Sequence, residues 1–182
     1  RSPGTRLAEI IGAFASAQRR RKPGDYLFGA GDAFQFFYVL SEGFAKSCYT
    51  TEDGRERTTG LHLRGDILGL DAIVTATHGC DAIALDACEV LTVPYDTVLL
   101  HFQRNPELAH ELLHAFSGEI RSDRELMLSM ITYSAEGRVA TLLLEMSCRF
   151  ASRGLSATKL QLHLTRQEIG SMLGLTLETV SR

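Results

Sequence analysis

The C-terminal segment LTRQEIGSMLGLTLETVSR gathers polar side chains that can bind nucleic acid. An arginine can donate two hydrogen bonds to guanine, a glutamate can accept one from the cytosine amino group, and a serine can reach a base edge or a phosphate. The candidate base-reading residues are Glu178, Ser181 and Arg182. Thr165 and Arg166, near the start of the segment, suit the backbone phosphates. The chemistry predicted here is recognition of DNA.

Two short helices are needed to position these side chains. Thr165 and Glu168 have the spacing of a capping box, and Gly174 falls where a left-handed residue ends a helix. Thr176 can then cap a second helix that opens with polar residues. Two helices joined by a tight glycine turn form a helix-turn-helix, whose second helix enters the major groove. Taken alone, the pattern also fits an ordinary solvated helix pair.

A second motif of chemical interest is HELLH, at residues 110–114. His110 and His114 share one helix face and can bind zinc, with Glu111 as general base. The extended motif of zinc proteases would need a histidine six residues after His114, where the chain has Ile120. A zinc-dependent hydrolase is therefore the alternative function. We expect two solvated histidines instead, with no metal ligand, no catalytic residue and no enzyme activity.

The elements upstream fall into a helix followed by a strand-rich region. Apolar residues at helical spacing predict a short amphipathic helix at about 5–19. From Lys22 to Tyr95, short runs of aromatic and β-branched residues alternate with glycine-containing turns, which predicts an antiparallel sandwich or roll. Asp53-Gly54 is the strongest hairpin signal, because this pair tolerates the positive φ of a tight turn.

A long helix is predicted after Pro106, and apolar residues follow its length at alternating steps of three and four. This spacing is typical of a coiled-coil seam, so we expect a dimer interface; a helix packed on its own domain is the alternative. The predicted interface residues are Leu113, Phe116, Ile120, Asp123, Met127 and Met130. The carboxylate of Asp123 would face its symmetry mate, and we hypothesise that this repulsion weakens the dimer.

Bulk composition gives weaker indications. The formal net charge of −3 shows no overall basic character, so a nucleic-acid partner must depend on a local patch. No apolar run approaches the roughly 18–20 residues of a membrane span, and we expect a cytoplasmic protein without a membrane partner. The cysteines are dispersed without a C-x-x-C pair and are expected to be reduced thiols: Cys48, Cys80, Cys88 and Cys148.

Several of these motifs together resemble the CRP/FNR family of transcription regulators, closest to its FNR branch. Besides the C-terminal segment, the landmarks are GDYLFGAGD, YVLSEGFAK, TEDGRE, GLHLRGDILGLDAI and SGEIRSD, in the family's order. The resemblance covers about Arg20 to Arg182. The family's base-reading positions fall on Glu178, Ser181 and Arg182, and the acidic seam residue of the FNR branch falls on Asp123.

The resemblance implies an α+β fold in three parts. Residues 1–104 would form a sensory β-roll of the cyclic-nucleotide-binding type, 105–133 a central dimerisation helix, and 134–182 the start of a winged-helix domain that ends inside its recognition helix. The implied function is a homodimer that binds a near-palindromic DNA operator and contacts RNA polymerase. A sensor module without DNA binding is the other alternative.

The sequence departs from the family at the effector positions. Members that bind cyclic AMP carry a Gly-Glu-Leu stretch and an Arg-Ser pair, where this chain has GLDAI (69–73) and GCDAIA (79–84). A phosphate would meet Asp81 and no guanidinium, which argues against cyclic AMP. Members with an iron–sulfur cluster carry a cysteine three residues before the proline that closes the roll. That position is Leu91 here, before Pro94, and Cys88 lies a further three residues back on the other strand face. The cysteines present therefore argue against a cluster.

Overall fold

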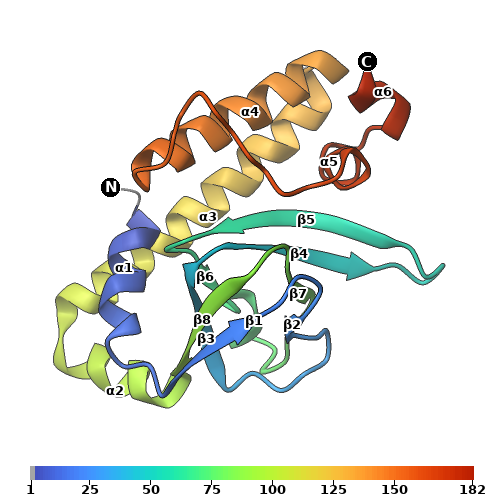
Figure 1. Ribbon diagram of the computed structural model, residues 1–182. Coiled ribbons are helices and arrows are strands. Elements are labelled where there is room, and N and C mark those ends of the chain that lie inside the picture. Colours follow the sequence, from blue (N-terminus) through green and yellow to red (C-terminus); the bar gives the residue numbers. More distant parts are fainter. Residues whose placement is uncertain (1–2) are drawn as a thin grey trace.

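The computed structural model describes residues 3–182 as a β-roll with helices along one side and above it (Figure 1). The strands are β1 (Ala17–Arg21), β2 (Tyr26–Phe28), β3 (Phe36–Glu42), β4 (Phe44–Thr50), β5 (Glu56–Leu63), β6 (Ile67–Leu68), β7 (Asp81–Ala84) and β8 (Cys88–Pro94). The helices are α1 (Pro3–Gly12), α2 (Tyr95–Arg104), α3 (Pro106–Thr132), α4 (Ala135–Ser152), α5 (Arg166–Leu173) and α6 (Leu177–Ser181), with a 3-10 turn at Asp71–Ile73.

Two antiparallel sheets make up the roll. One has the order β1-β8-β3-β6 and the other β2-β7-β4-β5. Strands β4 and β5 form a long hairpin whose tip contains Asp53 and Gly54, and Gly54 has the positive φ of 77° that the turn requires. The antiparallel roll, the long helix and the C-terminal helix pair of the predicted fold class are thereby confirmed.

The predicted N-terminal helix was too long. Helix α1 ends at Gly12, after burying Leu7 and Ile11 against the roll. The chain from Ala17 onward pairs instead with β8, with Arg19 opposite Val90. The reason is that the apolar helical stripe stops at Phe14, so the following residues gain more from completing the sheet than from another helical turn.

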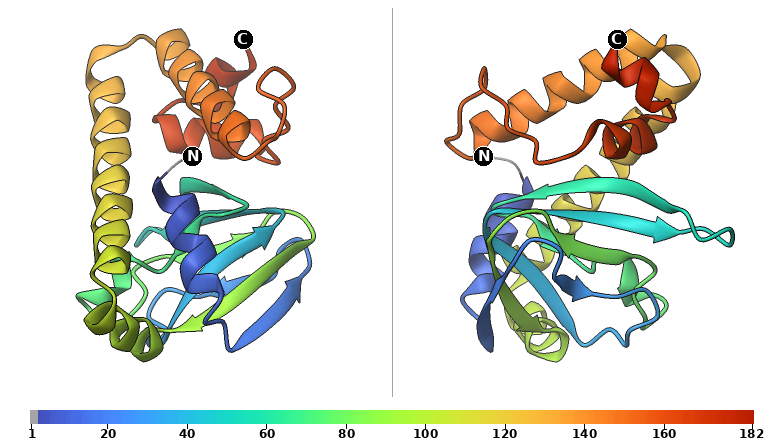
Figure 2. Two further views of the ribbon diagram at one scale, coloured as in Figure 1. Left: turned by 90° about the vertical axis from the view of Figure 1, so that its left-hand side faces the viewer. Right: turned by 45° about the vertical axis from the view of Figure 1, so that its right-hand side comes forward.

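Helices α3 and α4 carry the chain from the roll to its C-terminal end. Asn105 caps α3 by accepting from the backbone N–H groups of Glu107 and Leu108, with Pro106 in the first turn. The chain reverses at Tyr133, and α4 folds back across the roll (Figure 2). None of the helices within residues 3–182 combines the length and hydropathy of a membrane-spanning segment.

His62 on β5 makes the folded state sensitive to acid. Its Nε2 atom lies 2.9 Å from the Ser47 hydroxyl, and burial lowers its pKa to about 4. As the pH falls from 6.5 toward 4, His62 takes up a proton in the unfolded chain but stays neutral in the folded chain. The free energy of unfolding therefore decreases in that window. At about 1.4 kcal/mol per pKa unit, the loss reaches roughly 3 kcal/mol.

We expect His62→Gln to flatten the decline in unfolding free energy between pH 6.5 and 4, as measured by chemical denaturation at several pH values. His114→Gln, at an exposed position on α3, is the matched control and should keep the wild-type slope. Equal slopes for the two variants would contradict the prediction.

Candidate nucleic-acid interface

Helix α5 begins with the predicted capping box. The Thr165 hydroxyl accepts from the Glu168 backbone N–H at 3.2 Å, and Glu168 Oε2 accepts from the Thr165 backbone N–H at 2.7 Å. Two of the N–H groups that a helix start leaves without partners are thus satisfied. Thr165 and Arg166 stand exposed at this end of the helix.

The turn between α5 and α6 is a close backbone contact. Gly174 takes the left-handed conformation, with φ of 63°, and ends α5. The Leu175 N–H then donates to the Gly170 carbonyl at 2.8 Å. A Cβ atom on Gly170 would lie 2.7 Å from the Leu175 carbonyl oxygen. Only glycine allows the second helix to approach the first this closely.

Gly170→Ala is therefore expected to cost about 1–3 kcal/mol, because the backbone carbonyl cannot move aside without opening the turn. Thermal unfolding followed by circular dichroism measures this effect. Gly118→Ala on α3 is the control, since a Cβ there meets nothing within 4 Å, and it should leave stability unchanged or slightly raised. A Gly170→Ala protein as stable as wild type would show that the turn tolerates a side chain.

Helix α6 presents the three candidate base-reading side chains to solvent. Thr176 caps it by accepting from the Thr179 backbone N–H at 3.3 Å. Glu178, Ser181 and Arg182 are all exposed. Hydrogen bonds from its own backbone N–H and from the Thr176 hydroxyl lower the pKa of Glu178, so it is an anionic acceptor at neutral pH. The site brings together an anionic acceptor on α6 and an exposed donor, Arg182, at the end of this helix.

The helix pair is anchored to α4 rather than free on a linker. Arg138 donates to the Tyr133 carbonyl and, at 3.1 Å, to the carbonyl of Leu173 at the end of α5. Beneath this contact lies a shared apolar core of α4, α5 and strand β5 residues. Its buried members are Leu61, Leu63, Leu142, Met146, Phe150, Met172 and Leu173.

The predicted dimer seam on α3 divides into exposed and packed residues. Leu113, Ile120 and Met127, spaced seven apart, are 66%, 52% and 55% exposed. Asp123 is exposed among them. Phe116 instead packs against the core between the roll and the helices, and Met130 is half-buried. Within the single chain, two of the six predicted seam residues are thus partly covered, while Leu128 and Ile131, outside the predicted set, are exposed on α3 as well.

All four thiols are free, and three of them are buried. Burial raises the pKa of Cys48 to about 11, of Cys80 to about 12 and of Cys88 to about 11, while Cys148 lies exposed on α4. Among residues 3–182 no three histidine, cysteine, aspartate or glutamate side chains are grouped to hold a metal. The residues present do not fit an iron–sulfur cluster.

Residues 69–73 and 79–84 are the positions at which members that bind cyclic AMP would hold the nucleotide, and they carry acidic side chains here. Asp81 Oδ1 accepts from the Ala30 backbone N–H at 2.8 Å, and Asp71 stands exposed near Gly79. His78 is buried in the adjacent aromatic cluster, with its ring stacked on Phe28 and its Nδ1 atom unpaired. Two carboxylates and no guanidinium do not fit a phosphodiester.

The HELLH motif lies on the N-terminal half of α3. The rings of His110 and His114 are neighbours, with centroids 4.4 Å apart, and both side chains are exposed. Glu111, the general base of the hydrolase alternative, forms an ion pair with Arg6 of α1 at 3.1 Å. The glutamate therefore joins two helices, and its carboxylate is not free to activate a water.

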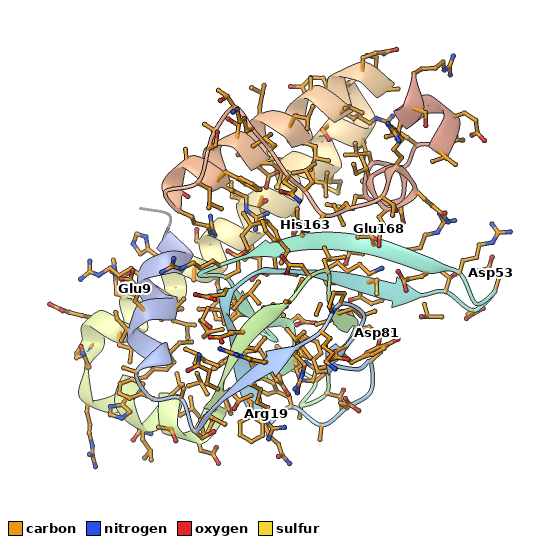
Figure 3. The ribbon with its side chains drawn as sticks, viewed as in Figure 1. Glu9, Arg19, Asp53, Asp81, His163 and Glu168 are labelled. Atoms are coloured by element: carbon orange, nitrogen blue, oxygen red, sulfur yellow. The ribbon has the colours of Figure 1, made fainter. Side chains whose placement is uncertain are left out.

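Sequence reasoning missed the ionic contacts that join the roll to α4 and to α5. Lys46 on β4 reaches Glu168 on α5, with Nζ and Oε1 2.7 Å apart. Asp66, in the β5–β6 turn, binds Arg149 and Arg153 of α4. Figure 3 shows Glu168 between β5 and α5. A charge pattern cannot reveal such pairs before the fold is known.

Two family models match the chain on either side of α3. Residues 18–105 match a cyclic nucleotide-binding domain, and residues 137–182 match a Crp-like helix-turn-helix domain. The matches correspond to the β-roll with α2 and to α4 with the helix pair.

Curated relatives and solved structures are consistent with the two family models. The fumarate and nitrate reduction regulatory proteins of Shigella dysenteriae and of Escherichia coli K12 are each 40% identical over 166 residues, which is 90% of this chain. The chain spans 66% of the length of these relatives. The structure of FixK2 from Bradyrhizobium japonicum is 30% identical, with a TM-score of 0.81, covering 91% of this chain and 81% of FixK2. The catabolite activator protein of Thermus thermophilus is 26% identical, with a TM-score of 0.59, covering 100% of this chain and 84% of that protein.

Proposed function

Because the chain belongs to the CRP/FNR family of transcription regulators, we propose that it is a sequence-specific DNA-binding regulator that acts as a homodimer. The observation that carries the proposal is the capped helix α6 with Glu178, Ser181 and Arg182 exposed on it. Arg182 would donate to guanine, Glu178 would accept from cytosine, and Ser181 would bind a base edge or a phosphate. Thr165 and Arg166, at the start of α5, would hold the DNA backbone.

The three segments of the chain would divide the work. Residues 1–104 would form the sensory domain, 105–133 the dimerisation helix, and 134–182 the DNA-binding part. The exposed face of α3 supports dimerisation, because three large apolar side chains at seven-residue intervals match the repeat of a coiled coil. RNA polymerase would be the second macromolecular partner, and a DNA target implies a cytoplasmic protein. We propose no catalytic role.

The residues of the roll argue against cyclic AMP, and the cysteines present argue against an iron–sulfur cluster, as the signal. The carboxylates of Asp71 and Asp81 would repel the phosphodiester of a cyclic nucleotide. The chain's match to the cyclic nucleotide-binding domain is therefore taken to reflect the shared fold of the roll. Among residues 3–182 no three potential ligand side chains are grouped to hold a metal, and Leu91 stands three residues before Pro94, where cluster-binding members carry a cysteine.

Selection from a random duplex library by the full-length protein tests this function. We expect one near-palindromic site, bound by a dimer, with an affinity that falls steeply as salt rises, since phosphate contacts release counterions. Recovery of no enriched sequence, or of a monomer indifferent to salt, would refute the proposal.

A further inference from the structure

We propose that Lys46, Asp66 and Ser171 are positioning residues for DNA binding: they hold the helix-turn-helix against its own β-roll, so that the two reading heads of the dimer are presented at one fixed separation. By reading head we mean α5 and α6 with their connecting turn. The inference rests on the proposed function and adds to it the residues that set the head's orientation.

The first contact joins the hairpin to α5. The Lys46 side chain is only 10% exposed, and its ammonium lies between the carboxylates of Glu56, on its own hairpin, and Glu168, on α5. Although burial alone would lower the pKa of Lys46, the two carboxylates raise it, so the group stays charged. Close by, the Thr58 backbone N–H of β5 donates to the Ser171 hydroxyl of α5 at 3.0 Å. The hairpin therefore grips α5 at two points one turn apart.

The second contact joins the β5–β6 turn to α4. Asp66 Oδ2 accepts from Arg149 at 2.6 Å, and Asp66 Oδ1 accepts from Arg153, whose side chain is 5% exposed. Arg153 also donates to the Arg64 carbonyl at 2.7 Å. Burial alone would raise the pKa of Asp66, but the two guanidinium groups hold it below its ordinary value. Charge-assisted bonds of this kind have strict geometry, which fixes α4 against the roll.

These contacts leave the base-reading surface free. Helix α5 lies between β5 and α6 in the views of Figures 1 and 2, so the roll grips the face of the reading head that is turned away from α6. A cleft of about 540 Å³ opens beside these contacts, between the hairpin and the start of α5; it is lined by Arg55, Glu56, Arg57, Thr58, Thr165, Gln167, Glu168 and Ser171. Glu178, Ser181 and Arg182 remain exposed beyond it. Docking therefore orients the head and does not cover it.

A fixed orientation matters most in a dimer. The two reading helices must enter successive major grooves, about 34 Å apart along the duplex. If the docked position is populated by a fraction f of heads, the affinity of a dimer for correctly spaced half-sites falls as f squared. A variant that reduced f to about one third would thus bind its operator roughly tenfold more weakly.

The test compares Lys46→Met with Glu56→Gln in the full-length protein. Lys46→Met removes the charge that crosses to α5, whereas Glu56→Gln removes only the partner within the hairpin. The probes are the duplex selected by the wild type and versions with one or more base pairs inserted between the half-sites. We expect Lys46→Met to bind the selected duplex about tenfold more weakly and to lose less on the respaced duplexes, so that its spacing preference shrinks. Glu56→Gln should keep the wild-type profile.

A second variant tests the same contact in case Lys46→Met destabilises the folded protein. Ser171→Ala removes the acceptor of the Thr58 N–H without changing charge, and hydrogen exchange at the Thr58 amide should then accelerate, with a similar though smaller loss of spacing preference. An unchanged spacing profile in Lys46→Met, or tighter binding by it, would overturn the inference while leaving the proposed function intact. A wild-type protein that selects no duplex would overturn both.

Discussion

Arg182→Ala should weaken binding to the selected operator by about 30-fold or more, because each of the two heads loses a base contact worth roughly 1–3 kcal/mol. Arg182 is exposed just after the last residue of α6, and its backbone N–H bonds the Glu178 carbonyl. Its guanidinium is therefore carried by an ordered backbone, free to meet a guanine edge. Equilibrium binding to the selected duplex and to single-base variants of it measures both the loss and its base dependence.

The pattern of the loss distinguishes base reading from general attraction to phosphate. Arg182→Ala should flatten the preference at one position of each half-site and leave discrimination elsewhere unchanged. Arg166→Ala is the matched control, since it removes the same charge at the start of α5. It should weaken all duplexes uniformly and reduce the salt slope by about one for each head. Uniform weakening by Arg182→Ala would assign that residue to the backbone instead.

Ile120→Glu should raise the dimer dissociation constant by at least about a hundredfold, because a coiled-coil seam would then have to bury two unpaired carboxylates. Ile120 lies at the centre of the exposed apolar face of α3, with Leu113 and Met127 one heptad away on either side. Analytical ultracentrifugation over a range of concentrations measures the change. DNA affinity should fall with it, since a monomer engages one half-site only.

Two companion variants make this test specific. Leu144→Glu places the same charge at an equally apolar, 68% exposed site on α4 and should leave the dimer constant unchanged. Asp123→Ala should act in the opposite direction and tighten the dimer, since it removes a pair of carboxylates from the seam. A dimer constant insensitive to Ile120→Glu would place the interface on another face.

The reading head could be predicted almost completely from the sequence because its determinants are local. Thr165 and Glu168 are three residues apart, and the left-handed turn at Gly174 depends on the absence of a side chain there. The roll was predictable for a similar reason, since turn glycines such as Gly54 mark the ends of its strands. Capping and turn chemistry operate over a few residues and leave a readable pattern.

What escaped prediction depends on partners distant in sequence. Strand β1 exists because Arg19 pairs with Val90, and a helical pattern ending at Phe14 gave no warning of it. Lys46 and Glu168 are separated by 122 positions, and either could have been solvated. Phe116 has the spacing of a seam residue yet packs on its own roll. In each case the structure depends on a partner distant in sequence, which the pattern of neighbouring residues does not reveal.

One carboxylate oxygen of Glu168 accepts from the Thr165 backbone N–H at the start of α5, and the other accepts from Lys46. This division of labour bears on chimeric regulators, in which the DNA-reading module of one protein is grafted onto the sensor of another. A donor module with glutamine at the position of Glu168 would still start its helix but would carry no counterion for this roll. Grafts onto this roll should therefore keep an acidic residue at position 168. Otherwise Lys46 should be replaced by the residue that the donor protein's own roll carries at that position.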